Sequence, residues 1–337
     1  MLLVNAWYRG SPWLRLLQPL AAGFGWFSRR RRRRLLAGQR DLPLPMIVVG
    51  NITVGGTGKT PVVLGLAQAL QAAGYRPGIV TRGYGARPTT LPWPVKENDD
   101  PQQAGDEPLL LARRSGLPVV LDPDRCRAVR HLAEHTDCDV IISDDGLQHY
   151  AMARLAEIVV VDGRRGLGNA RLLPAGPLRE SAQRLREVDA VLVNGEPGRD
   201  VVRQLDGSGW QSMTLTPRAW VNLRDGRRLA PDALQNTNSM VATAGIGHPE
   251  RFFTLLRSLG YTAEWHPFPD HHHFRREDLA FAADRTLVMT EKDAVKCREW
   301  AEADWWYLEV AVVLPDEVLQ TVQGRLREWA AARTDDR

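Results

Sequence analysis

Short apolar runs alternate with longer helical stretches along most of the chain. The runs lie at residues 46–49, 78–81, 139–143, 157–162, 190–194, 239–244 and 286–290. Most are rich in Val, Ile or Leu and all are short, which is typical of strands buried on both faces. Because helical stretches separate the runs, the pattern predicts an α/β fold in which helices cover both faces of a parallel sheet.

Two breaks in this alternation divide the chain. Polar and apolar residues alternate over 214–230 around Asp225-Gly226, which predicts a β-hairpin. An amphipathic helix is predicted from Pro315 onward. We therefore predict four parts: an N-terminal segment (1–38), a first α/β domain (39–213), a β-hairpin linker (214–238) and a smaller α/β domain with a C-terminal helix (239–337).

The N-terminal segment carries an apolar stripe followed by six arginines. The stripe has the spacing of one helix face and consists of Trp13, Leu16, Leu17, Leu20, Phe24 and Phe27. It is shorter than the roughly 20 apolar residues of a membrane span, and a secretory signal would carry its charges before the apolar part. The pattern favours a helix at a membrane surface over residues 13–34. A helix packed on the body of the protein and a nucleic-acid site are the alternatives.

The charge distribution weighs against the nucleic-acid alternative, so we predict no nucleic-acid partner. The chain of 337 residues has 44 basic and 40 acidic side chains, a net charge of +4. Nine arginines and no acidic residue fall within residues 1–40, and the rest of the chain has a net charge of −5. The three cysteines form no CxxC pair, which argues for a reducing compartment and against a disulfide framework or a zinc site.

A glycine-rich turn, GNITVGGTGKTP at 50–61, follows the first predicted strand and opens a helical stretch. This is the order of a phosphate-binding P-loop, although an ordinary strand-to-helix turn is the alternative. Glycines let backbone N–H groups approach phosphate oxygens, Lys59 would bridge the outer phosphates, and the Thr60 hydroxyl would hold Mg²⁺. The predicted nucleotide-binding residues are Thr53, Val54, Gly55, Gly56, Thr57, Gly58, Lys59 and Thr60.

Acidic side chains stand at two further places where strands or helices meet loops. Asp144 and Asp145 follow the strand 139–143, where a carboxylate orients Mg²⁺ in P-loop proteins, although an Asp-Gly turn is the alternative. Asp106 precedes Glu-Pro and an apolar run, so it is either a helix start or a base for a substrate hydroxyl. Within His271 to His273, one histidine tuned by a carboxylate is a better explanation than a metal site.

Residues 168–180 are too rich in Gly and Pro for a helix and are predicted as a structured loop. This loop would present Arg171, Arg179 and Glu180. Arg82 follows the strand 78–81. Since ligands bind beyond the carboxyl ends of parallel strands, this edge of the sheet is the predicted binding site.

Seven stretches, in order along the chain, resemble one family, the tetraacyldisaccharide 4′-kinases (lipid A 4′-kinases) of Gram-negative bacteria. They are GNITVGGTGKTP (50–61), TRGYG (81–85), GDEP (105–108), SDDGLQH (143–149), GNARLLPAGPLRE (168–180), FPDHH (268–272) and TEKDAVK (290–296). The arginine-flanked N-terminus also resembles the family's membrane-docking helix. Ala170, where the family more often has glycine, is a small departure, and Thr53 is usual for the family.

The resemblance implies transfer of the γ-phosphoryl group of ATP to the 4′-hydroxyl of a tetraacyldisaccharide 1-phosphate lipid. It implies a P-loop NTPase-like domain joined by a β-hairpin linker to a smaller α/β domain, with the active site between them. The implied roles are catalysis by Asp106, His271 and Lys59, Mg²⁺ binding by Thr60, Asp144, Asp145 and Glu180, and substrate or phosphate binding by Arg82, Arg171 and Arg179.

The resemblance also implies a peripheral protein on the cytoplasmic face of the bacterial inner membrane, where ATP is available and acyl chains hold the substrate. No protein partner is inferred. The alternative from another class is a membrane-associated P-loop GTPase or ATPase switch. It would explain the P-loop and the basic N-terminus but not GDEP or FPDHH.

Overall fold

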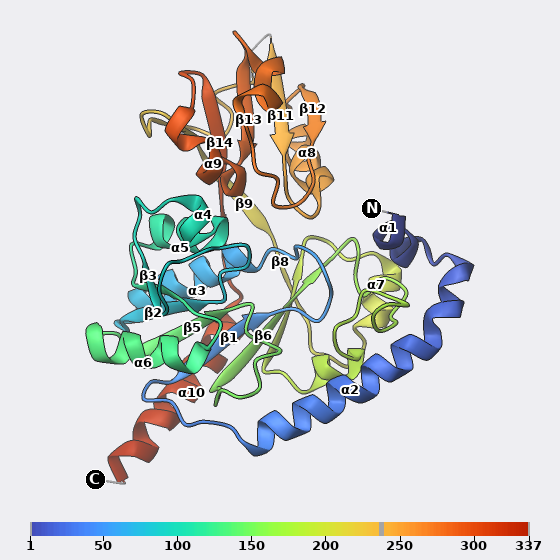
Figure 1. Cartoon of the computed structure of the whole chain (residues 1–337), viewed down its shortest axis with the longest axis vertical. Helices are drawn as coiled ribbons and strands as arrows, with labels where there is room; N and C mark the ends of the chain where they lie inside the picture. Colours follow the sequence, from blue (N-terminus) through green and yellow to red (C-terminus); the bar gives the residue numbers. More distant parts are fainter. Residues whose placement is uncertain (1, 236–238, 336–337) are drawn as a thin grey trace.

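The computed structural model describes residues 2–235 and 239–335, which form two α/β units stacked along the long axis of the molecule (Figure 1). One unit is built on a sheet of eight strands and the other on a sheet of six. The α/β fold predicted from the sequence is therefore confirmed. The last residues of the predicted linker, 236–238, and the chain ends, residue 1 and residues 336–337, lie outside the described residues.

The first sheet has the strand order β3-β4-β2-β5-β1-β6-β7-β8. Its strands are β1 (Met46–Gly50), β2 (Pro77–Thr81), β3 (Trp93–Val95), β4 (Val119–Leu121), β5 (Val140–Asp144), β6 (Ala156–Asp162), β7 (Ala190–Asn194) and β8 (Gln211–Met213). Neighbouring strands run parallel except β3 and β4. Every residue of β1, β2, β5 and β6 is buried, because helices cover both faces.

Side chains of β1 point alternately into two cores on opposite faces of this sheet. Ile47 and Val49 lie in the core under α3 (Lys59–Ala72), α5 (Asp106–Ser115) and α10 (Asp316–Asp335). Met46 and Val48 lie in the core under α6 (Arg125–His135), the 3-10 helix η2 (Ala182–Arg186) and α7 (Arg199–Gln204). The C-terminal helix α10 thus returns to the first unit although its sequence follows the second. The short helix α4 (Pro101–Ala104) precedes α5.

The second sheet has the order β10-β9-β14-β13-β11-β12. Its strands are β9 (Leu215–Asn222), β10 (Arg228–Leu229), β11 (Met240–Ala244), β12 (Glu264–Pro267), β13 (Thr286–Thr290) and β14 (Trp305–Val312). The helices are α8 (Pro249–Ser258) and α9 (Glu291–Cys297), with the 3-10 helices η3 (Arg276–Ala282) and η4 (Arg298–Trp300). Buried aromatic side chains fill one face of this sheet, among them Trp220, Phe253 and Trp306.

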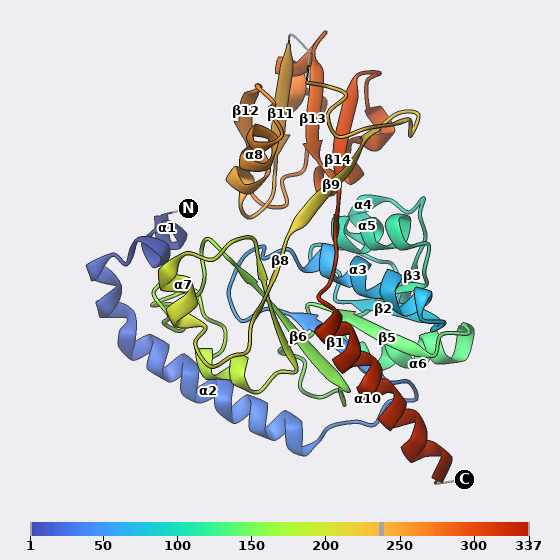
Figure 2. The same ribbon diagram turned by 180° about the vertical axis from the view of Figure 1, so that it is seen from behind.

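A ribbon of two long strands joins the units (Figure 2). β9 pairs antiparallel with β14 from Asn222 opposite Trp306 to Leu215 opposite Val312. The Trp306 end lies in the core of the second unit, whereas Leu215 and Val312 belong to the core of the first. The predicted hairpin is present as β9 and β10, but the longer partner of β9 is β14.

The N-terminal segment folds as α1 (Leu2–Arg9), the 3-10 helix η1 (Pro12–Leu17) and α2 (Gln18–Ala37), and α2 lies along the outside of the first unit (Figure 1). The six arginines lie within α2. The inner face of the segment is small and closely packed: Leu14, Ala21 and Gly25 are buried, and an added β-carbon on Gly25 would lie 2.6 Å from Leu172 Cδ1.

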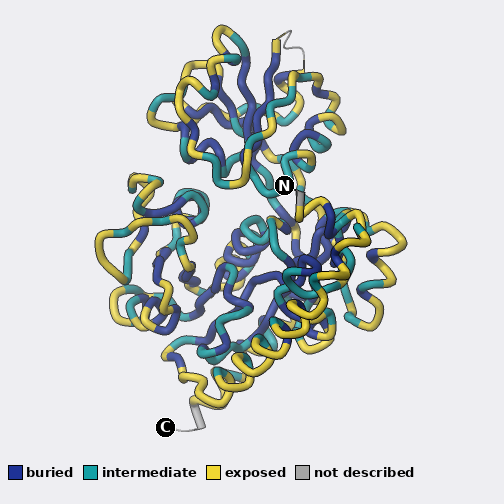
Figure 3. The backbone as a smooth tube through the Cα atoms, turned by 45° about the vertical axis from the view of Figure 1, so that its right-hand side comes forward, coloured by how far each residue is buried: buried dark blue, intermediate teal, exposed yellow. Residues whose placement is uncertain are grey.

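Most of the apolar stripe predicted for this segment is exposed to solvent, and the tube of α2 is largely yellow in Figure 3. Leu16 is 81% exposed, Leu20 62% and Phe27 59%. Trp13, also in the stripe, is exposed, and Trp26 adds further exposed aromatic surface. No helix within residues 2–235 and 239–335 is both long and apolar enough to cross a membrane.

Candidate active site

The P-loop forms the centre of the site, between the end of β1 and the start of α3. The helix begins at Lys59, and Gly58 caps it with φ +94°, a left-handed conformation that favours glycine. Asn51 donates from Nδ2 to Gly55 O (3.1 Å), and Asn194 at the end of β7 donates from Nδ2 to Thr57 O (3.0 Å). These bonds fix the loop so that the start of α3 is ready to bind an anion.

Two carboxylates stand beside this loop because β5 is the neighbour of β1. Asp145 Oδ1 lies 3.5 Å from Lys59 Nζ, and its Oδ2 lies 3.4 Å from Arg179 Nη1. Burial opposes ionisation of Asp145, but Lys59 and Arg179 hold its pKa below the ordinary value. Asp144 is fully buried, and this burial, with Glu107 and Asp145 nearby and Lys59 opposing them, raises its pKa to about 7.

The residues fit a divalent cation held together with nucleotide phosphates. Asp144 Oδ1 and Asp145 Oδ1 are buried and accept no hydrogen bond from the described residues. Thr60 lies in the first turn of α3, next to Lys59. No group of three or more His, Cys, Asp or Glu side chains in the described parts of the chain could hold a metal ion by itself. Such a set suits Mg²⁺, which commonly binds through one or two carboxylates, water and phosphate oxygens.

A carboxylate–histidine pair joins the two units. Asp106 begins α5 in the first unit, and its Oδ2 lies 3.3 Å from Nδ1 of His271, which follows β12 in the second. Burial acts to raise the pKa of Asp106, but the hydrogen bond from His271 and the charges of Lys296 and Lys292 bring it below the ordinary value. The pair, 165 positions apart in sequence, thus holds an ionised carboxylate.

Glu107 connects this pair to the P-loop. Its charge raises the pKa of Asp144, while Lys292 and Lys59 bring the pKa of Glu107 itself below the ordinary value against the effect of burial. On the second unit, an added β-carbon on Gly247 would lie 3.1 Å from the backbone nitrogen of Gly56. The second unit therefore covers the P-loop and brings His271 to the same site.

The remaining predicted residues are distributed unequally. Arg82 is exposed. The pKa of His149 is lowered to about 4, first by burial and then by the positive charges of Arg125, Arg82 and Arg31, the last of which lies on α2. Thr53 is buried, and Val54 N–H donates to Pro177 O at 2.9 Å, which ties the P-loop to the loop 168–180.

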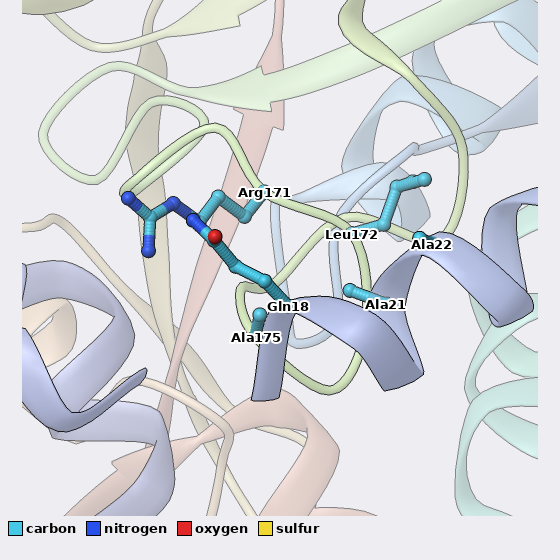
Figure 4. Close-up of a pocket in the computed structure, with 6 residues that line it drawn as sticks. All are labelled: Gln18, Ala21, Ala22, Arg171, Leu172 and Ala175. Atoms are coloured by element: carbon cyan, nitrogen blue, oxygen red, sulfur yellow. The ribbon is translucent and has the colours of Figure 1, made fainter. Parts of the chain in front are cut away.

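Arg171 does not join the P-loop cluster. It lines an open pocket of about 190 Å³ with Gln18, Ala21, Ala22, Leu172 and Ala175, between α2 and the loop 168–180 (Figure 4). None of these residues belongs to the P-loop, so the structure sets Arg171 beside the N-terminal helix.

Glu180 already has protein partners on both carboxylate oxygens. Gln148 donates from Nε2 to Oε1 at 2.8 Å, and the Tyr150 hydroxyl donates to Oε2. Gln148 Oε1 in turn accepts from Arg179 Nη1 at 3.4 Å. Glu180 therefore supports the arginine that pairs with Asp145.

The three consecutive histidines diverge. His271 faces Asp106, His272 Nε2 lies 3.1 Å from Asp278 Oδ2, and His273 is exposed. The three adjacent side chains thus have separate surroundings.

Several residues at the site were missed from the sequence. Arg125 is buried and donates from Nη2 to Asp144 O at 2.8 Å. Asp162, at the end of β6, pairs with Arg251 of the second unit, and Lys292 contacts Glu107 and His271. For Asp162, as for Asn194, the position in the sequence could have indicated a role, because both residues end strands at the P-loop edge of the sheet.

Groups that can bind phosphates on one unit thus lie beside a carboxylate–histidine pair completed by the other unit, so the fold and site define a P-loop phosphotransferase. The family model for tetraacyldisaccharide-1-P 4′-kinase matches residues 13–327. The chain therefore belongs to the tetraacyldisaccharide 4′-kinase family and is a kinase, as the sequence motifs indicated.

Individual relatives agree over nearly the whole length. The tetraacyldisaccharide 4′-kinase of Ectopseudomonas mendocina is 51% identical over 318 residues, covering 92% of both chains. That of Pseudomonas aeruginosa strain PAO1 is 49% identical over 332 residues, covering 98% of both. The crystal structure of LpxK from Aquifex aeolicus in complex with ATP has a TM-score of 0.75 and 27% identity, covering 93% of this chain and 99% of that one. This likeness supports the use of ATP.

The geometry of the P-loop predicts that Gly58→Ala weakens nucleotide binding. A β-carbon on Gly58 would overlap the Asn194 amide, and φ +94° costs a residue other than glycine about 1–2 kcal/mol. The loop would have to move, so we expect the Kd for Mg·ATP, measured by isothermal titration calorimetry, to rise at least about tenfold.

Gly74→Ala is the matched control. Gly74 has φ +88° at the end of α3, but nothing lies within 4 Å of its added β-carbon. It should lose a similar amount of stability while keeping its affinity for Mg·ATP. A folded Gly58→Ala protein with the affinity of the wild type would contradict the role of this turn.

Proposed function

We propose that the chain transfers the γ-phosphoryl group of Mg·ATP to the 4′-hydroxyl of tetraacyldisaccharide 1-phosphate, with Asp106 as the base. The observation that carries these residue roles is the 3.3 Å contact between Asp106 and His271 beside a P-loop. A substrate hydroxyl has a high pKa, so a carboxylate that accepts its proton as the new bond forms assists the transfer. His271 orients the carboxylate.

The P-loop backbone and Lys59 bind the phosphates of the nucleotide and neutralise charge that develops on the transferred group. Thr60, Asp144 and Asp145 would hold Mg²⁺. The support is that Asp144 Oδ1 and Asp145 Oδ1 are buried and accept no hydrogen bond from the described residues. When bound, Mg²⁺ supplies positive charge to the β- and γ-phosphate oxygens. Arg179 pairs with Asp145 at 3.4 Å and keeps that carboxylate ionised.

Glu180 acts in this proposal through Gln148 and Arg179, because both of its oxygens already accept hydrogen bonds. Arg82 lies at the exposed edge of the site and binds substrate phosphate. Arg171, which lies beside α2, would contact the lipid nearer to the membrane.

The N-terminal segment holds the enzyme on the membrane surface, facing the compartment that supplies ATP. The support is that α2 packs on the body through its small residues Ala21 and Gly25, which leaves the larger apolar side chains of the segment exposed to solvent. Exposed apolar patches of this kind mark interaction surfaces. Exposed arginines such as Arg30 and Arg33 follow on the same helix and suit anionic head groups.

Purified protein in detergent micelles should transfer labelled γ-phosphate from Mg·ATP to tetraacyldisaccharide 1-phosphate. Lys59→Ala should reduce the rate by at least about a hundredfold, because it removes the cation beside the transferred charge. Thin-layer chromatography of the lipid gives the readout. Lys59-dependent release of free phosphate without labelled lipid would instead favour the membrane NTPase switch.

Asp106→Asn should lower kcat by roughly 10²–10⁴-fold, the usual contribution of a general base, and leave the Kd for Mg·ATP within about twofold. His271→Gln should have a smaller effect on kcat, since it removes only the orienting partner. Single-turnover kinetics and calorimetry separate the two quantities. Equal losses of ATP affinity and rate in Asp106→Asn would refute the division of roles.

Leu16→Glu combined with Leu20→Glu should reduce binding to vesicles of phosphatidylethanolamine and phosphatidylglycerol by tenfold or more. Burying each leucine in an apolar phase contributes roughly 2 kcal/mol, which the carboxylates would remove. Flotation of the vesicles measures the bound fraction. These substitutions disturb the fold less than removal of residues 1–34, which would delete the cluster of Ala6, Trp7 and Leu14 and expose Val54 and Leu173, which pack against it.

Val313→Glu is the matched control for the membrane experiment, because Val313 is 70% exposed but lies after β14, away from the N-terminal segment. It should bind vesicles like the wild type. Undiminished binding of the double variant would show that the stripe does not hold the membrane.

A further inference from the structure

Lys292 lies at the start of α9, a position that is unfavourable for a positive charge. It is the second residue of α9, and the positive end of a helix dipole repels a cation in the first turn. Its side chain is only 16% exposed. Burial acts to lower the pKa of Lys292, but Glu107 and Asp270 outweigh burial and raise it above the ordinary value. A buried cation is thus held at an unfavourable position by charges from both units.

The ammonium group touches three partners at the site. Lys292 Nζ lies 2.9 Å from Glu107 Oε1, 3.5 Å from Asp270 Oδ1 and 3.3 Å from His271 Nε2. An ammonium group has three donors and no acceptor. It therefore needs a lone pair on Nε2, and any form of His271 with a proton on Nε2 would point that N–H at the ammonium group.

The other ring nitrogen of His271 meets the base. Nδ1 lies 3.3 Å from Asp106 Oδ2, a contact that requires a proton on Nδ1 because the ionised carboxylate only accepts. The backbone of His271 is also constrained, with φ +57° and its N–H donating to Asp270 Oδ1 at 3.1 Å. A residue other than glycine in the left-handed region is uncommon and marks a side chain whose direction matters.

We infer that Lys292 is a positioning residue that fixes His271 in the tautomer with its proton on Nδ1, so that Nδ1–H donates to Asp106 and orients it as the base. The inference rests on the proposed role of Asp106. Lys292 accepts no proton and touches no reacting atom in this scheme. The same ammonium group also pairs with Glu107 on α5, so it joins the two units beside the histidine.

The competing explanation is a purely structural one, in which Lys292 serves only to hold α5 against α9. The chain offers a matched control for it. Arg114 on α5 pairs with Glu291 on α9 at 2.7 Å in the same interface. Glu291 directly precedes Lys292 in the sequence. Breaking that pair weakens the contact between the same two helices but leaves the donor to His271 Nε2 in place.

The test uses the full-length protein with ¹⁵N-labelled histidine. The ring nitrogens of His271 are assigned by their loss in His271→Gln and report which nitrogen carries the proton. The wild type and Arg114→Gln should show the proton on Nδ1, whereas Lys292→Met should show a mixture or a proton on Nε2. In the lipid phosphorylation assay Lys292→Met should lower kcat by about tenfold or more, but by no more than His271→Gln does, with a KM for ATP within about twofold, as expected for a base whose orienting histidine is in the wrong tautomer.

Lys292→Arg should recover most of the rate and the wild-type tautomer, because guanidinium also donates without accepting. If Lys292→Met does not fold, Lys292→Gln serves instead. The glutamine amide oxygen can accept a hydrogen bond from Nε2–H of His271, so this variant should show a mixture of tautomers. An unchanged tautomer in a folded Lys292→Met or Lys292→Gln protein would overturn the inference, as would equal rate losses in Lys292→Met and Arg114→Gln. A full rate in Asp106→Asn would instead refute the proposed base.

Discussion

The position of α5 is the constraint on which the site depends. Its buried face, Leu109 to Ala112, packs in the first core with α3, the helix that begins at Lys59, so Asp106 and the P-loop lysine are held by the same packing. Its other contacts reach α9 in the second unit through Arg114–Glu291 and Glu107–Lys292. Since interiors are close-packed, α5 cannot shift without disturbing one of these contacts. One ten-residue helix therefore fixes Asp106 relative to both the P-loop and His271.

The charges at this site are stable only as a set. Burial disfavours the ionised form of each carboxylate, and a buried charge needs a partner. Asp106, Glu107 and Asp145 have cationic partners and pKa values below the ordinary one, whereas Asp144 has a raised pKa. Asp144 is thus the carboxylate whose ionised form gains most from an added cation. The difference follows from placement: Asp144 ends a central strand, and Arg125 donates to its carbonyl oxygen rather than to its carboxylate.

The sequence predicted those features that leave a local pattern. The central strands were predictable because burial on both faces makes them continuous apolar runs, whereas β3, β4 and β8 have only three residues each and leave no such signal. The stripe of α10, with Val318, Val322 and Leu326, predicted a helix but not the sheet it covers. The contact of Asp106 with His271 follows from the ribbon β9–β14 and from β12, and no spacing within the sequence encodes it. The family resemblance suggested this pair, but it gave no role to Lys292 and associated Arg171 with phosphate rather than with α2.

The N-terminal segment, which we propose contacts the membrane, is joined to the P-loop unit by packing as well as by charge. Val54 of the P-loop packs against the cluster of Ala6, Trp7 and Leu14, and Trp7 Nε1 donates to Pro174 O at 3.0 Å. Arg32 of α2 pairs with Glu187 and lies over the ring of Tyr150, whose hydroxyl binds Glu180. The N-terminal helices are therefore in contact, through a few buried side chains, with the P-loop and with the residues that support Arg179. If the helix lies on the membrane as we propose, this packing would fix the height of the site above the lipid surface, and an acceptor hydroxyl on a membrane lipid would have to rise only that distance to reach Asp106.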